Sequence, residues 1–196
     1  MSEPHRRRDA ARNRTALLRA GAELLSECGP GFSLEAVAAR ANVSTSTAYR
    51  NFTDGQAVVQ AYLDQLGTDL LSAFDVLLAD EADPLGRVRG LCRVWVTEAA
   101  GWGRSVAPLR SAQGFLARRA AGDAFVTGLY QRLADVLGAA MRAGQLPRAE
   151  VRYAVLVWIT LFDERLVVDL VTTEGWSVER VARRLTSTLI RSLGGG

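Results

Sequence analysis

The stretch that decides the fold is LEAVAARANVSTSTAYRNF, from Leu34 to Phe52. Helix-forming residues fill its first half, whereas its second half opens with four hydroxyl residues, Ser44 to Thr47. Serine and threonine side chains compete for backbone hydrogen bonds and therefore favour the starts of helices over their interiors. The stretch predicts a short helix from Leu34 to Ala41, a tight turn, and a second short helix that begins after Ser44.

The spacing of small and turn-forming residues predicts how these helices meet. Ala38 is small enough for a close, steep helix crossing, and Asn42 tolerates the positive φ that such a turn needs. Val43 and Ala48 bury the inner face of the second helix, and Ser44 caps its N-terminus. This is the arrangement of a DNA-binding helix-turn-helix, whose second helix enters the major groove. A plain helical hairpin with alanines in its core is the alternative.

The flanking residues make the pattern more specific. RTALLRAGAELLSECG precedes the stretch, FSLEAVAARANVS and TSTAYRNF contain it, and DGQAVVQAYL follows it. Over these segments, roughly Arg14 to Tyr62, the sequence resembles the TetR family of bacterial transcriptional regulators. The resemblance implies an all-α fold of about nine helices: an N-terminal three-helix DNA-binding domain, and a larger helical domain for ligand binding and dimerisation. Beyond Tyr62 only chain length and helix pattern resemble the family.

The resemblance also implies which residues touch DNA. It directs Thr45, Ser46 and Thr47 toward the duplex, and their hydroxyls can donate to phosphates or to base acceptors. Tyr49 and Asn51 occupy phosphate-contacting positions. Arg50 can bind guanine with two hydrogen bonds or, equally, a phosphate. Phe52 is expected to point inward. The full predicted DNA-binding set is Arg14, Ser33, Ser44, Thr45, Ser46, Thr47, Tyr49, Arg50 and Asn51.

Three positions depart from the family pattern. Ser46 replaces a common glycine, Asn51 a common histidine, and Gly55 a lysine that grips a phosphate. A basic arm, Arg6 to Arg14, is a hypothetical substitute for the lost contact, acting through the minor groove. Such tails are also commonly solvated and disordered. We expect residues 1–53 to form the DNA-binding domain, with this arm, and 54–196 the effector-binding and dimerisation domain.

The rest of the chain also shows helical spacing of apolar residues. Glycine, proline and capping residues divide it into segments. The predicted helices are about 9–28, 54–79, 85–100, 108–120, 123–143, 148–171 and 177–193.

No catalytic constellation is visible in the sequence. The single histidine, His5, lies in the N-terminal arm, and no phosphate-binding loop is present. Asp163 and Glu164 are neighbours that point apart on a helix, and an Arg165–Asp169 salt bridge is expected. We therefore predict no enzyme activity, no cofactor and no metal site.

The cysteines and the apolar segments indicate the cellular compartment of the protein. Cys28 and Cys92 lack the spacing of a disulfide framework, which favours a reducing cytoplasm. The longest apolar run, Ala154 to Phe162, is too short to span a membrane. No membrane partner is expected.

Large aromatic residues distinguish the C-terminal two-thirds. Tryptophan beside glycine in EAAGWGRS suggests a helix break that lines a cavity, and the family resemblance implies an effector pocket there. Glu98 and Arg104 are possible polar anchors in a mostly apolar lining, which favours a hydrophobic small molecule. Ordinary core packing is the alternative for each aromatic residue. The predicted pocket is Phe74, Trp95, Glu98, Trp102, Phe115, Phe125, Trp158 and Phe162.

The two last helices, about 148–171 and 177–193, would form a homodimer by the same resemblance. The final helix offers an apolar stripe of Val178, Val181, Leu185, Leu189 and Leu193. Two-fold symmetry would let a pair of recognition helices read a palindromic operator.

We therefore predict a ligand-responsive, DNA-binding repressor that binds a palindromic operator as a homodimer and is released by a small, mostly hydrophobic effector. The alternative is a small-molecule-binding protein of the same fold with weakened DNA binding, because Gly55 replaces the lysine. The operator, the effector, the regulated genes and the sign of regulation are not encoded in any pattern of this sequence.

Overall fold

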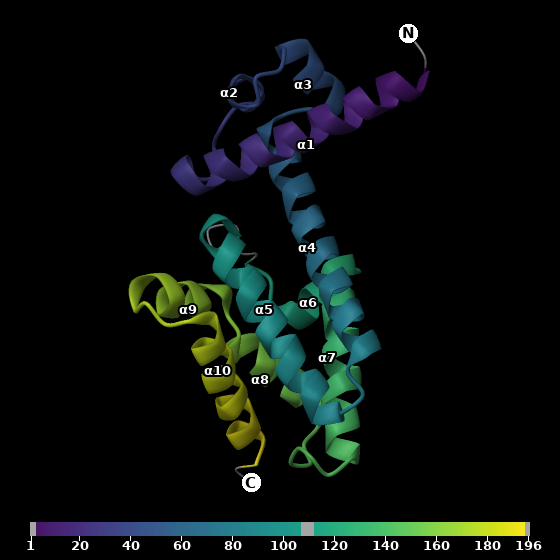
Figure 1. The fold of residues 1–196 in the computed structure, drawn as a ribbon, viewed down its shortest axis with the longest axis vertical. Coiled ribbons are helices and arrows are strands. Elements are labelled where there is room, and N and C mark those ends of the chain that lie inside the picture. The colour runs from purple at the N-terminus through teal and green to yellow at the C-terminus, as the bar shows by residue number, and fades with distance from the viewer. Residues whose placement is uncertain (1–2, 107–111, 195–196) are drawn as a thin grey trace. The chain divides into compact units, whose positions relative to one another are not determined.

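The computed structural model describes residues 3–106 and 112–194, with side chains from residue 9 onward except at 104. Every regular element in these ranges is helical, as predicted (Figure 1). The contacts between Cα atoms divide the chain into two compact units, Met1–Leu66 and Gly67–Gly196. The boundary falls inside α4 (Gly55–Asp80). The functional division at residues 53 and 54 stays a prediction.

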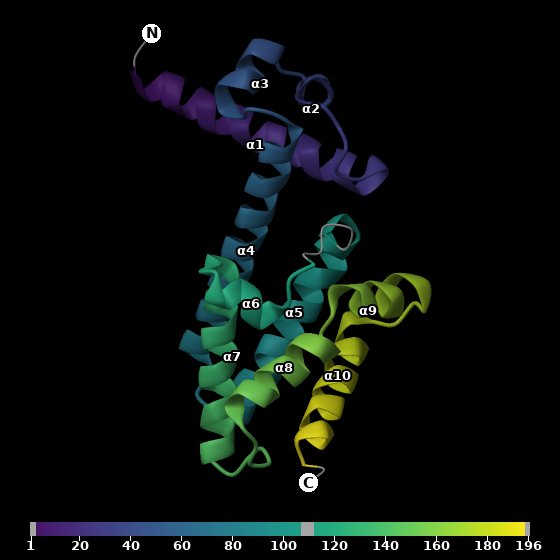
Figure 2. The same ribbon diagram turned by 180° about the vertical axis from the view of Figure 1, so that it is seen from behind.

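The first unit is a small bundle in which α2 (Leu34–Arg40) and α3 (Thr45–Asn51) pack against each other and against α1 (Glu3–Cys28) (Figures 1 and 2). The first turns of α4 complete it. Its core is formed by apolar residues from all four helices, because each helix presents one apolar stripe. The fully buried members include Leu17, Leu34, Val37, Ala48 and Val58.

Hydroxyl and carboxylate caps fix where these helices begin. Ser33 accepts a hydrogen bond from the Ala36 amide, and Ser44 accepts one from the Thr47 amide. Asp54 accepts one of 2.8 Å from the Ala57 amide at the start of α4. Each bond satisfies an amide that has no partner within its own helix. The predicted starts of these helices are confirmed.

The first helix begins earlier than predicted. We expected it at Asp9, whereas the backbone is already helical from Glu3. Proline is well tolerated in the first turn of a helix, and Pro4 stands there.

The second unit is built around α5 (Pro84–Val106), which packs against α7 (Ala124–Arg142), α9 (Glu164–Val168) and α10 (Val178–Leu193). Figure 2 shows α8 (Val151–Leu161) between α7 and α10. One apolar cluster joins these helices, with Leu91, Leu137, Trp158 and Leu189 among its buried members. No helix within the described ranges is long and apolar enough to cross a membrane.

The glycine-flanked tryptophan segment is not a helix break. The structure continues α5 through Gly101, Trp102 and Gly103 to Val106. A Cβ added at Gly103 would lie 2.5 Å from a methyl group of Val168 in α9. Glycine is present here because it lets two helices approach closely, whereas we expected it to end a helix.

The predicted single helix over residues 148–171 is wrong. It is divided into α8, α9 and a π-helical segment, η2 (Asp169–Thr173). Phe162 leaves helical geometry with φ −97° and ψ 34°, and Asp163 caps a new helix by accepting from the Arg165 amide. The expected Arg165–Asp169 salt bridge is replaced by one between Arg165 and Asp163, with 3.1 Å between Nε and Oδ1.

Two further expectations concern the middle of the second unit. The predicted helix over 108–120 lies partly outside the described residues, and its described part becomes helical only in α6 (Phe115–Ala120). The next two helices begin within one residue of their predicted starts, and each begins with a side-chain cap. Asp123 accepts from the Val126 amide at the start of α7, and Ser177 accepts from the Arg180 amide at the start of α10.

Candidate DNA interface and effector site

The turn between α2 and α3 has the geometry that the sequence predicted. Asn42 adopts a φ of 54°, the only positive value at a non-glycine position among the described residues. The Val43 amide donates 3.0 Å to the Ala38 carbonyl, which closes the turn. Ala38 and Ala48 are buried where the helices cross. Small side chains are needed there because the two backbones approach closely.

Hydroxyl groups form a connected network at the start of α3. The Ser44 Oγ lies 3.1 Å from the Ser46 Oγ and 2.8 Å from the Thr47 Oγ1. Thr45 and Ser46 are exposed, and Thr47 is half-buried. The network holds the hydroxyls in one arrangement before any ligand arrives, so a bound phosphate or base edge would meet oriented donors and acceptors.

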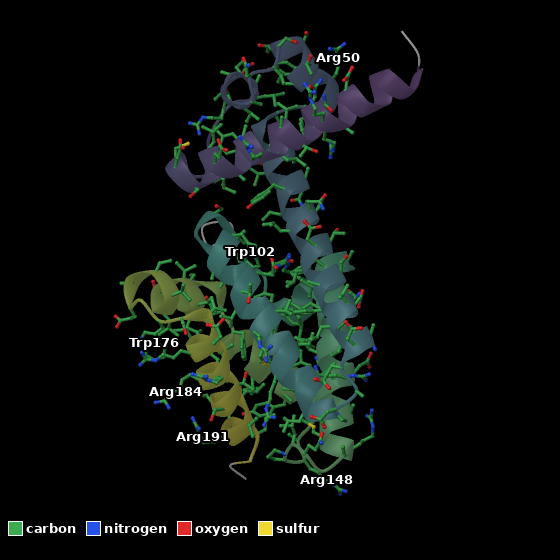
Figure 3. All side chains as sticks on the ribbon, viewed as in Figure 1. Arg50, Trp102, Arg148, Trp176, Arg184 and Arg191 are labelled. Atoms are coloured by element: carbon green, nitrogen blue, oxygen red, sulfur yellow. The ribbon has the colours of Figure 1, made fainter. Side chains whose placement is uncertain are left out.

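Arg50 and Asn51 both donate a hydrogen bond to Thr47, but they differ in solvent exposure. Arg50 is exposed at the end of α3 (Figure 3), and its Nη2 donates 2.9 Å to the Thr47 hydroxyl. Asn51 is half-buried, and its Nδ2 donates 2.8 Å to the Thr47 carbonyl. Arg50 has further donors for DNA, whereas a phosphate contact by Asn51 requires its amide to share or leave this bond.

Tyr49 carries a contact that sequence reasoning missed. Its ring is 53% exposed, and its hydroxyl donates a 2.6 Å hydrogen bond to Oε1 of Glu35 in α2. This bond lowers the pKa of Glu35 and raises the pKa of Tyr49. A carboxylate is thus held beside a side chain that was predicted to contact phosphate. In the sequence, the one signal for Glu35 is its position in the first turn of α2, where helices favour acidic residues.

The remaining predicted DNA-binding residues, Arg14 and Ser33, lie on other elements. The guanidinium carbon of Arg14 lies 4.6 Å from the centre of the Phe52 ring, a cation–π contact between α1 and the end of α3. Phe52 is buried, as predicted. Ser33 caps α2 and is exposed. Both residues therefore also stabilise the fold of the first unit.

A close backbone contact, which the sequence did not reveal, explains why position 55 is glycine. A Cβ added at this position would collide with the backbone carbonyl oxygen of Phe32. Backbone cannot move aside as a flexible side chain can. The glycine therefore permits the loop before α2 to pack against the first residue of α4, besides lacking the charge of a lysine.

A groove of about 390 Å³ on the first unit was also missed. Arginines from α1 and α2 line it together with Glu23. Arg40 holds Glu27 through two hydrogen bonds of 2.8 and 2.9 Å and lies 3.6 Å from Glu23. These ion pairs tie the end of α2 to α1.

Four of the predicted pocket residues form one aromatic group in the second unit. The ring centres of Trp95 and Trp102 lie 5.9 Å apart, and those of Trp95 and Trp158 lie 5.1 Å apart, both edge to face. Phe162 stacks on Trp158 at 4.7 Å. Edge-to-face and stacked aromatic pairs add specific stabilisation to ordinary apolar burial. We call Trp95, Trp102, Trp158 and Phe162 the aromatic group.

The three other aromatic residues predicted for the pocket belong to the same apolar core. Phe74 is fully buried, while Phe115 and Phe125 pack partly buried against the core. Phe125 also packs on Gly67, where an added Cβ would lie 2.8 Å from its ring. Glu98 is half-buried on α5. The side chain of Arg104 lies outside the described part of the chain.

The first unit matches a known protein family in sequence. The family "Bacterial regulatory proteins, tetR family" matches residues 17–62. No curated protein matches the chain in sequence.

Solved structures share the fold across almost the whole chain. FadR from Bacillus subtilis, in complex with stearoyl-CoA, has a TM-score of 0.75 at 15% identity and covers 90% of this chain and 97% of its own. A tetR-family regulator from Rhodococcus RHA1 has a TM-score of 0.71 at 19% identity, covering 99% and 98%. The SmeT–triclosan complex has a TM-score of 0.67 at 20% identity, covering 94% and 93%. Residues 17–62 therefore match the TetR family of bacterial regulatory proteins, and the chain shares the all-helical fold of solved TetR-family regulators.

Proposed function

We propose that the protein is a ligand-responsive transcriptional repressor that binds a palindromic operator as a homodimer in the cytoplasm and leaves it when a small, mostly hydrophobic effector binds. The observation that carries the proposal is the outer surface of α3. It presents oriented hydroxyls and Arg50 on a helix whose inner face is fixed by buried Ala48, with the turn at Asn42. This is the geometry that a recognition helix needs in the major groove.

The recognition surface reads DNA with few charges. α3 holds one cation, Arg50, and the first residue of α4 is Gly55. Binding should therefore depend on hydrogen bonds from hydroxyls and on Arg50 more than on a dense basic patch. A hydroxyl can donate to a phosphate or to a base acceptor. Because it is uncharged, it adds little to the salt dependence of DNA binding.

The proposed dimer must use a surface other than the predicted stripe of α10. Four of its five residues, Val181, Leu185, Leu189 and Leu193, are buried in the core of their own unit. The outward face of α10 is polar instead, and Figure 3 shows Arg184 and Arg191 pointing away from the core. Tyr153 of α8 and Leu166 of α9 are exposed large apolar residues at 54% and 38%. We propose that the exposed faces of α8 and α9 contribute to the dimer contact.

The proposed effector site is the aromatic group. Its four members come from α5, α8 and the residue that follows α8, and all of their rings are largely apolar. FadR and SmeT were solved with stearoyl-CoA and triclosan, molecules with large apolar parts. An effector can release DNA only by binding the DNA-incompetent conformation more tightly than the competent one.

The direct test is DNA binding to the region upstream of the protein's own gene, measured by gel shift over a range of salt concentrations. Sequence-specific retardation that weakens with salt supports the regulator. Release on addition of hydrophobic compounds supports the effector role. Sedimentation of the free protein and of the complex reports the oligomeric state.

A second candidate is a small-molecule-binding protein of the same fold with weakened DNA binding. Gly55 favours it, because the phosphate-gripping cation is missing and the packing against Phe32 leaves no room for a side chain. Compound binding without specific retardation at low salt would identify this candidate. Chemical turnover of a bound compound would instead identify an enzyme.

A further inference from the structure

Three tryptophans meet in the aromatic group, and only one has its indole N–H paired. The Nε1 of Trp158 donates 3.4 Å to the Cys92 sulfur. The Nε1 atoms of Trp95 and Trp102 are buried and have no acceptor among the residues that the structure describes. Trp95 is only 7% exposed. Figure 3 shows Trp102 near the C-terminal end of α5, on the same helix as Trp95.

Such unpaired donors are unusual. A buried donor without a partner destabilises a protein by about 1–3 kcal/mol, so most buried polar groups in native proteins are paired. The indole N–H can only donate, so what it lacks is an acceptor atom. The two unpaired donors belong to rings that touch each other edge to face, at an interplanar angle of 87°.

The helices beside this pair are short and irregular. Trp158 and Phe162 lead to the break between α8 and α9, and α9 has five residues and runs directly into the π-helical segment η2. π-helical turns are rare and occur frequently at functional sites. Gly103, one residue beyond Trp102, packs directly against Val168 of α9. α9 packs on α5 and its Val167 is fully buried, so this short segment adjoins the end of α5 that carries Trp102.

We propose that the effector is a neutral, largely apolar molecule with a carbonyl oxygen, and that this oxygen accepts hydrogen bonds from the indoles of Trp95 and Trp102. A carbonyl oxygen has two lone pairs and can accept from two donors. A neutral carbonyl oxygen also avoids the cost of burying a charge among these largely apolar rings. The inference rests on the proposed effector site and adds the chemical class of its ligand.

The test uses the full chain labelled with ¹⁵N in its tryptophans and needs no DNA. The probes are acetophenone and ethylbenzene, which have nearly the same shape and differ in the carbonyl group. A new N–H···O hydrogen bond moves an indole proton signal downfield. Acetophenone should move the Trp95 and Trp102 signals downfield, and ethylbenzene should not. Trp158, already paired, and Trp176, whose ring contacts Arg180, serve as internal references.

Variants separate hydrogen bonding from packing. Trp95→Phe and Trp102→Phe should each weaken acetophenone binding about tenfold more than they weaken ethylbenzene binding, whereas Trp158→Phe should weaken both equally. Equal losses for both probes in all three variants would overturn the proposal, and so would unshifted Trp95 and Trp102 signals at saturating acetophenone. If a variant fails to fold, the two probes on the wild-type protein still decide. Loss of DNA binding leaves this readout intact, so failure of the regulator proposal is distinguishable.

Discussion

The hydroxyl of Tyr49 donates a 2.6 Å hydrogen bond to the carboxylate of Glu35, which joins the two helices of the helix-turn-helix across their exposed side. The bond lowers the pKa of the Glu35 carboxyl group. Tyr49 therefore cannot donate to a phosphate without leaving Glu35, and a negative charge remains beside the proposed interface. We infer that Glu35 limits DNA affinity.

Glu35→Gln should raise DNA affinity about threefold to tenfold. It removes a negative charge near the phosphates and weakens the bond that holds the Tyr49 hydroxyl, because a neutral amide oxygen is a weaker acceptor than a carboxylate, while the shape of the side chain is kept. A small loss of stability is expected, because an acidic residue in the first turn favours the helix. Fluorescence anisotropy with labelled upstream DNA gives the affinity, and Glu174→Gln in the second unit is the control. Unchanged or weaker binding by Glu35→Gln would contradict this role.

Asn42 should tolerate glycine but not alanine. Its φ of 54° lies in the left-handed region, which is unfavourable by roughly 1–2 kcal/mol for most residues, whereas glycine reaches it freely. Asn42→Ala should lower the free energy of unfolding by about 1 kcal/mol, and Asn42→Gly should change it by less. Urea unfolding followed by circular dichroism measures both. Equal destabilisation by the two substitutions would argue against this explanation.

Gly55→Lys should not restore a phosphate contact. The added Cβ meets the Phe32 carbonyl, so the first unit must rearrange before the lysine can reach DNA. We expect a lower melting temperature and no gain in specific affinity. Gln56→Lys adds the same charge at the next, exposed position and should bind DNA more tightly at low salt without loss of stability. A stable Gly55→Lys variant with higher affinity would refute the steric argument.

The two cysteines should react differently. Cys28 is exposed, whereas Cys92 is buried and its pKa is raised to about 11 by burial. Because the thiolate is the reactive form, one thiol should react with a disulfide reagent at pH 8 in the native protein, and the second only in guanidinium chloride. Rapid reaction of both thiols in the native state would show that the core around Trp158 opens readily.

Local chemistry explains which parts of the fold could be predicted. Capping residues signal helix starts because each side chain accepts a hydrogen bond from the backbone amide three residues ahead. The residues that do so are Ser33, Ser44, Asp54, Asp123 and Ser177. Asn42 signals the turn because few residues adopt its backbone angles. These effects depend on neighbours in sequence, so the pattern is sufficient to locate them.

Most of the errors came from tertiary packing, and one came from a local cap that was missed. Gly101 and Gly103 resemble a helix end, but α5 continues through them, and Gly103 is small because Val168 of another helix lies against it. Apolar spacing predicts one helix through Phe162, whereas Asp163 caps a new one there. In the candidate sites, the Glu35–Tyr49 bond and the unpaired indoles of Trp95 and Trp102 depend on how separate segments meet, which periodicity does not encode.

The most direct test of the central claim is the affinity of Arg50→Ala for the DNA upstream of its own gene, measured by anisotropy over a range of salt concentrations. Arg50 is the single cation of α3, so its loss should weaken specific binding by about 1–3 kcal/mol, roughly fivefold to 150-fold. Arg191→Ala, an exposed arginine of α10, should bind as the wild type does. Specific binding by Arg50→Ala that equals the wild type would contradict the assignment of α3 as the recognition helix.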